Sequence, residues 1–230
     1  MRKLARDLRP FPFALIFVAF FILSSGGLQA ELHEPADIDF PTSDGGQIHA
    51  HLYGSGDHAV VLAHGKVFNK ESWQPLSEIL AGRGFRVLAL DFRGYGQSIA
   101  GSEPGRLDLD VLGAVAYLGS QGVKDVSLIG ASMGGWAVAN AATQCKPGRL
   151  QNVILMAPAP IDAPEAMQAD RILYIVSEGE PGLGRIRQQY DRAPDPKQLE
   201  LLPGSAHAQH IFKTDQAEAL VDLILAALAD

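Results

Sequence analysis

A serine lies in a turn of small residues where its hydroxyl could act as a nucleophile. Residues 126–135 read as an apolar strand, the turn Gly-Ala-Ser-Met-Gly around Ser132 and the start of a helix. The amino-terminal end of a helix favours negative charge, so an anion that develops beside Ser132 would be stabilised there. A serine that caps a helix after a glycine is the alternative explanation of the same residues.

Two other groups of residues suggest chemistry. His49 and His51 alternate along one predicted strand and therefore share a face, as two metal ligands would. No third ligand stands at a recognisable spacing, so we expect two partly exposed histidines at a sheet edge and no metal site. Cys145 is the only cysteine, which excludes an intrachain disulfide, and no motif marks it as reactive.

From residue 36 onward, short β-rich apolar runs alternate with amphipathic helical segments, a pattern typical of a parallel sheet flanked by helices. The expected strands are residues 38–42, 47–53, 58–63, 85–91, 126–130, 153–157, 171–177 and 198–202. The expected helices are residues 72–83, 107–121, 133–144, 183–192 and 215–228. Most strands are continuous Val, Leu and Ile runs, as expected when both faces of a sheet are covered. The sequence therefore predicts an α/β fold with a twisted, mostly parallel sheet of about eight strands and helices on both faces.

The connections between these elements add two expectations. Residues 43–46, Ser-Asp-Gly-Gly, favour an antiparallel hairpin at one edge of the sheet. Residues 158–170, between two of the expected strands, are too few for a separate lid domain. We therefore expect a shallow, open site.

Composition and charge limit the classes of function. A chain of 230 residues with 47% apolar and 20% charged residues suits one folded domain, which we expect over residues 31–230. The net charge of −7 comes from scattered acids, and the only dense basic cluster lies in the first ten residues. This distribution excludes a nucleic-acid-binding face.

Residues 1–30 have the pattern of a secretory signal peptide. Basic residues precede the apolar run 13–23, and small residues ending in Ala30 follow it. The run is shorter than the roughly 20 residues of a membrane-spanning helix, but extension to Leu28 leaves an uncleaved anchor as the alternative. We expect a periplasmic or secreted protein that contacts a membrane only if this segment stays uncleaved.

The turn around Ser132 resembles the nucleophile elbow of the α/β-hydrolase superfamily. In that family small residues flank the serine, because strand and helix approach each other too closely for larger side chains. Gly130, Gly134 and Gly135 meet this need. The resemblance extends over roughly residues 45–228 and implies that Ser132 is the nucleophile.

Two further loops are similar to those of the same family. His64-Gly65 matches its His-Gly turn before the oxyanion loop, which implies that the backbone N–H groups of Lys66 and Met133 hold the oxyanion and that His64 is structural. Residues 91–98, Asp-Phe-Arg-Gly-Tyr-Gly-Gln-Ser, match its D-x-R-G-x-G-x-S loop. In this loop we expect the side chains of residues 91 and 93 to pair.

The family's order of serine, acid and histidine places the general base late in the chain. Its last loop, usually G-x-x-H-G-x-x-L-F, resembles residues 204–212 and aligns His207 with the base, while His210 falls at a variable position. Ala208 stands where glycine is common. We expect this departure to alter the loop backbone more than the chemistry.

The acid that orients the imidazole is open to three assignments. Glu180 stands about three residues past the predicted strand 171–177, where the family usually has an aspartate. Glu178 is one alternative. Asp162 is another, because some relatives take the acid from the end of the preceding strand.

The resemblance implies a serine hydrolase that acts on carboxylic esters or related acyl compounds through an acyl-enzyme intermediate. The expected partner is a small-molecule acyl substrate, and no metal or organic cofactor is needed. A peptidase, an amidase or a thioesterase would use the same motifs. The alternative from another class is a non-catalytic binding module on this scaffold, with Glu180 and Ala208 as signs of relaxed constraint.

Overall fold

Residues 34–229, which the computed structural model describes, contain one mixed sheet with the strand order β1-β2-β4-β3-β5-β6-β7-β8. The strands are β1 (Ala36–Pro41), β2 (Gln47–Tyr53), β3 (His58–Ala63), β4 (Arg86–Leu90), β5 (Asp125–Ala131), β6 (Leu150–Met156), β7 (Arg171–Ser177) and β8 (Lys197–Leu202). Strand β2 runs antiparallel to β1 and β4, and the other neighbouring pairs are parallel. The predicted mostly parallel eight-stranded sheet is confirmed.

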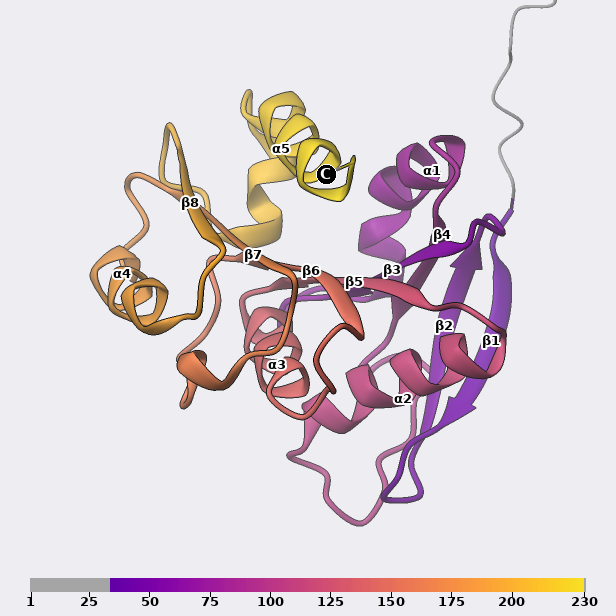
Figure 1. Ribbon diagram of the computed structural model, residues 1–230. Helices are drawn as coiled ribbons and strands as arrows, with labels where there is room; N and C mark the ends of the chain where they lie inside the picture. The colour runs from indigo at the N-terminus through magenta and orange to yellow at the C-terminus, as the bar shows by residue number, and fades with distance from the viewer. Residues whose placement is uncertain (1–33, 230) are drawn as a thin grey trace, which may run out of the picture. The chain divides into compact units, whose positions relative to one another are not determined.

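Helices cover both faces of this sheet, as predicted (Figure 1). One face carries α1 (Gln74–Gly82) and α5 (Ala217–Ala229), and the other carries α2 (Leu107–Ser120), α3 (Met133–Ala142) and α4 (Leu183–Arg192). Short 3-10 helices lie in the connections: η1 (Lys70–Trp73), η2 (Pro164–Ala166) and η3 (Ala208–Lys213). The expected first helix, 72–83, is split, because its first two residues belong to η1 and the α-helix begins at Gln74.

The apolar strands form the core of the fold. In β3 the side chains of Val60, Val61 and Leu62 are fully buried, as are Leu128 and Ile129 in β5. Burial of a side chain of this size contributes roughly 1.5–3 kcal/mol to folding. Because the parallel strands all end at the same edge of the sheet, the loops that follow β3, β5, β7 and β8 come together there.

The turn between β1 and β2 has the predicted hairpin geometry. The Thr42 hydroxyl donates to the Asp44 carboxylate at 2.6 Å and accepts a hydrogen bond from the Gly46 amide at 2.8 Å. Gly45 has a φ of 85°, a conformation that favours glycine. The antiparallel pairing is confirmed, and β1 forms one edge of the sheet.

Between β6 and β7 the chain forms only the short helix η2, so no separate lid domain lies in this connection. Across the described residues, no helix has both the length and the apolar character that crossing a bilayer requires. The predicted signal peptide or anchor, residues 1–30, lies outside the part of the chain that the structure describes.

Candidate active site

Ser132 lies at a sharp turn between β5 and α3. Its φ of 52° and ψ of −110° fall in a region that residues other than glycine rarely occupy, at a cost of roughly 1–3 kcal/mol. A Cβ at Gly130 would lie under 3.0 Å from the Gly134 carbonyl, and one at Gly134 would lie under 3.0 Å from the Ala63 carbonyl. Only glycine fits at either position. This is the close approach of strand and helix that the predicted nucleophile elbow requires.

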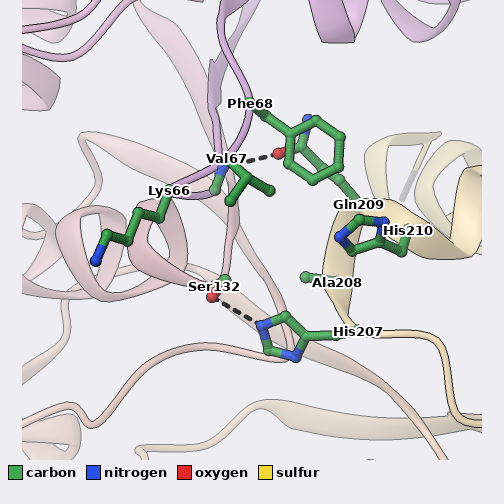
Figure 2. Close-up of a pocket in the computed structure, with 9 residues that line it drawn as sticks. Lys66, Val67, Phe68, Ser132, His207, Ala208, Gln209 and His210 are labelled. Carbon is green, nitrogen blue, oxygen red and sulfur yellow. Dashed lines mark hydrogen bonds between the residues drawn. The ribbon is translucent and has the colours of Figure 1, made fainter.

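Ser132, His207 and Glu180 form a hydrogen-bonded chain. The Nε2 atom of His207 lies 2.8 Å from the Ser132 Oγ atom (Figure 2). The Nδ1 atom of the same imidazole lies 2.8 Å from the Glu180 Oε2 atom. The glutamate side chain is only 6% exposed, whereas that of His207 is 43% exposed and faces solvent on one side.

The loops after β7 and β8 bring this histidine and this carboxylate together. The amide of Glu178 donates to the Leu202 carbonyl, and the amide of Gly179 donates to the Gly204 carbonyl, each at 2.8 Å. The Ser177 hydroxyl donates to the Ala206 carbonyl at 2.6 Å. These bonds join the two loops residue by residue, so positions 180 and 207 emerge side by side.

The three candidate acids have different surroundings. Glu180 is buried, and its second oxygen accepts a hydrogen bond from the Gly182 amide at 3.2 Å. Glu178 is exposed, and within residues 34–229 its side chain makes no hydrogen bond. Asp162 lines a separate hollow beside Trp136. The structure therefore brings Glu180, and neither alternative, to His207.

The second late histidine, His210, lies away from the serine. Its ring packs against the Phe68 ring with 5.0 Å between centroids, and Figure 2 shows it turned toward Phe68 and not toward Ser132. On the described part of the chain, the only imidazole within hydrogen-bond distance of the Ser132 hydroxyl is that of His207.

Ala208 has a left-handed backbone conformation, which favours glycine. Its φ is 48° and its side chain is buried. The expectation that alanine would alter the loop backbone more than the chemistry stays a prediction, but the left-handed φ shows that alanine is accommodated at this position. For a residue with a Cβ this conformation costs roughly 1–2 kcal/mol.

Two backbone N–H groups are available beside Ser132. The Lys66 amide has no hydrogen-bond partner within residues 34–229. Met133 is the first residue of α3, where a helix leaves its amides without an intrahelical acceptor. In Figure 2 the Lys66 side chain lies on the opposite side of Ser132 from His207.

His64 is fully buried, and both of its ring nitrogens contact backbone groups. Nδ1 donates to the Gly65 carbonyl at 2.9 Å, and Nε2 accepts from the Phe92 amide at 3.2 Å. Burial lowers the pKa of this imidazole, so the neutral form is favoured. Through these contacts His64 holds the backbone of the His-Gly turn.

The loop 91–98 is held by other pairs than the one we expected. Arg93 binds Asp110 through Nη2 at 2.7 Å and Asp44 through Nη1 at 2.8 Å. Asp91 instead accepts from the Lys70 ammonium at 2.9 Å and from the Lys70 amide at 2.8 Å. The predicted pairing within the loop is wrong, because the two side chains reach partners on different elements.

The histidines of β2 face carboxylates of β1. His49 lies 3.0 Å from Asp39 and 3.5 Å from Asp37, and His51 lies 3.2 Å from Asp37. His49 is buried, not partly exposed as we expected, because β1 and Ser98 of the loop 91–98 cover it. In the described residues no group of three or more His, Cys, Asp or Glu side chains is arranged to hold a metal ion.

A cavity of about 220 Å³ opens beside the serine. It is lined by Gly65, Lys66, Val67, Phe68, Ser132, His207, Ala208, Gln209 and His210. Phe68 and Gln209 were not predicted from the sequence. Their position next to the His-Gly turn and the base loop is the only signal that could have pointed to them.

Comparison with known proteins agrees with this fold. Residues 60–227 match the model of the alpha/beta hydrolase family. A non-heme haloperoxidase of Rhodococcus erythropolis is 31% identical over 118 residues, which are 51% of this chain and 43% of that protein. A pimeloyl-[acyl-carrier protein] methyl ester esterase of Aliivibrio salmonicida is 35% identical over 106 residues, 46% of this chain and 38% of that protein.

Among solved structures, the esterase Pf2001 of Pyrococcus furiosus superposes with a TM-score of 0.72 at 18% identity, covering 85% of this chain and 90% of that one. The matches to the curated relatives span less than half of their length. The strained elbow, the sheet order and the family match together define the class. The chain belongs to the alpha/beta hydrolase family.

Proposed function

We propose that this protein is a serine hydrolase that acts on carboxylic esters. The hydrogen-bonded chain from Ser132 through His207 to Glu180 carries the proposal. Relatives in the family have names as different as haloperoxidase and esterase, so family membership does not select the reaction. The arrangement of the site is the stronger support.

The geometry supports a two-step acyl transfer. His207 Nε2 accepts the Ser132 hydroxyl proton as Oγ attacks the carbonyl carbon. The Glu180 carboxylate accepts the hydrogen bond from His207 Nδ1–H, which orients the imidazole and stabilises the imidazolium. The amides of Lys66 and Met133 donate to the oxyanion. The imidazolium then gives its proton to the leaving alcohol. In the second step the neutral imidazole removes a proton from the attacking water and returns it to Ser132 Oγ as the acid leaves.

The dimensions of the site favour small acyl groups. Cavities that hold drug-sized ligands measure roughly 300–1,000 Å³, and the cavity beside Ser132 measures about 220 Å³. No lid domain covers it within the β6–β7 connection. A short acyl chain would fill the space beside Phe68, and a long one would extend into solvent.

The test is hydrolysis of p-nitrophenyl esters from acetate to decanoate by the wild type and by Ser132→Ala. We expect activity that is highest on the shortest esters and that falls to background in the folded variant. Full residual activity in Ser132→Ala would contradict the proposed nucleophile. Highest activity on decanoate would contradict the small acyl group.

Two alternatives make different predictions. A peptidase or amidase would prefer aminoacyl amides to esters, and a thioesterase would prefer thioesters, so a substrate panel separates them. A non-catalytic binding module would leave Ser132 unreactive. Labelling of folded protein by a fluorophosphonate probe, absent in Ser132→Ala, would favour an enzyme over such a module.

A further inference from the structure

Gln209 is a buried side chain next to the proposed reaction centre that the mechanism above does not use. It is 3% exposed and stands two residues after His207. Its Oε1 atom accepts a hydrogen bond from the Gly65 amide at 2.7 Å, and its Nε2 atom donates to the Ser72 hydroxyl at 2.9 Å. It therefore joins the loop of the base to the loop after β3.

The chemistry of its neighbours requires a side chain with one acceptor and one donor. The Gly65 amide can only donate, so it needs an acceptor. The Ser72 hydroxyl donates its proton to the Asn69 carbonyl, so it is free to accept. A carboxamide satisfies both groups, and a hydrocarbon of the same shape would leave the Gly65 amide buried without a partner.

The bond to Gly65 acts on the neighbouring oxyanion donor. The Gly65 carbonyl accepts from His64 Nδ1 at 2.9 Å and from the Phe68 amide at 3.0 Å. In a trans peptide the C=O and the following N–H point in opposite directions, so these bonds turn the Lys66 N–H away from His64 and Phe68. Gln209 fixes the preceding peptide, and the Tyr95 hydroxyl binds the Lys66 carbonyl at 2.9 Å.

The backbone at Ala208 makes this link possible. With a φ of 48°, it turns the chain between the two residues that flank it. The imidazole of His207 consequently reaches Ser132, while the carboxamide of Gln209 reaches Gly65 (Figure 2).

We propose that Gln209 is a positioning residue that holds the Lys66 oxyanion donor in register with the His207 base. This inference rests on the proposed function. Gln209 acts through the Gly65–Lys66 backbone and touches no reacting atom. Its contribution is therefore expected in the transition state, where the oxyanion exists, and not in substrate binding.

The experiment compares Gln209→Leu, Gln209→Glu and the wild type on p-nitrophenyl acetate. Removing an oxyanion donor typically costs about 10²–10³ in kcat, so misplacing one through Gln209→Leu is expected to cost about 10- to 100-fold in kcat. KM should stay within about 2-fold. The glutamate retains an acceptor for the Gly65 amide, so Gln209→Glu should recover at least half of the loss on a logarithmic scale.

The pH profile separates positioning of the oxyanion loop from damage to the base. In Gln209→Leu the His207–Glu180 pair is untouched, so the acid limb of the kcat/KM profile should keep the apparent pKa of the wild type.

Gln144→Leu is the matched control, because it removes a glutamine that binds Asp108 just beyond the carboxyl end of α3. We expect wild-type kinetics for it.

Three results would overturn the inference: wild-type kcat in Gln209→Leu, a loss confined to KM, or a shifted acid limb. If Gln209→Leu does not fold, Ser72→Ala replaces it. That variant removes the acceptor of Nε2, and it should lower kcat by a smaller factor at constant KM. An unchanged kcat would again overturn the inference.

A wild type that neither hydrolyses esters nor reacts with a fluorophosphonate would refute the proposed function, and the role of Gln209 with it.

Discussion

At the scale of single residues, the site combines strain with close hydrogen bonding. Ser132 and Ala208 both have a positive φ. Ser132 directly precedes α3, and Ala208 is the first residue of η3. Such conformations persist only where surrounding contacts hold them. The Ser132 amide donates to the Met156 carbonyl at 2.9 Å, and the carbonyl of the same residue accepts from Ala159 and Trp136.

The identity of the acid can be tested by single substitutions. Glu180→Gln keeps the shape of the side chain but not the charge that stabilises the imidazolium, so we expect kcat to fall by about 10³- to 10⁴-fold. Glu178→Gln and Asp162→Asn are the matched controls and should retain wild-type kinetics. A larger loss in either control than in Glu180→Gln would contradict the proposed acid.

At the scale of elements, loops that are distant in sequence are held together by charged side chains. Arg93 joins the loop after β4 to the β1–β2 turn through Asp44 and to α2 through Asp110. Its guanidinium is almost completely buried, and so is the carboxylate of Asp44. Burial on its own lowers the pKa of Arg93, but the bonds to the two carboxylates outweigh it and raise this pKa.

These contacts predict a pH dependence of stability. The hydrogen bond from Arg93, followed by that from Thr42, lowers the pKa of Asp44 well below its ordinary value of 3.8. A depressed carboxyl pKa means that its stabilisation is fully present above pH 3.8 and is lost as the pH falls toward the folded pKa. We expect Asp44→Asn to be less stable than the wild type at pH 7, with a difference that narrows near pH 3.

Urea unfolding at the two pH values measures this effect. Asp57→Asn is a suitable control, because this exposed carboxylate makes no ion pair within the described residues. It should leave the pH dependence unchanged. An equal loss of stability in Asp44→Asn at pH 7 and pH 3 would argue against the titration of Asp44 as the cause.

At the scale of the whole molecule, the fold places every candidate functional group at one edge of the sheet. The loops after β3, β5, β7 and β8 supply the proposed oxyanion donors, nucleophile, acid and base. This arrangement follows from parallel strands, whose carboxyl ends share an edge.

Export of the chain is a further prediction at this scale. We propose that residues 1–30 direct secretion and are removed, so that N-terminal sequencing of protein from the periplasm or medium should begin near residue 31. Phe17→Asp, in the apolar run, should block export. Recovery of the uncleaved chain from membranes would favour the anchor, and recovery from the cytoplasm would contradict export.

Features that depend on residues close together in the chain were predictable from the sequence alone. The elbow was predictable because its glycines lie within three residues of Ser132, and the strands were predictable because apolar runs mark burial on both faces. His207 was predictable from its own loop. Each of these signals is complete within about ten residues.

Features that depend on contacts between distant loops became visible only in the folded chain. Which acid meets His207 was settled by the bonds that join the loops after β7 and β8. Arg93 and Asp44 stand 49 residues apart, and Gly65 and Gln209 stand 144 residues apart. Side chains at such separations meet only through the path of the whole chain, and no local pattern in the sequence records that path.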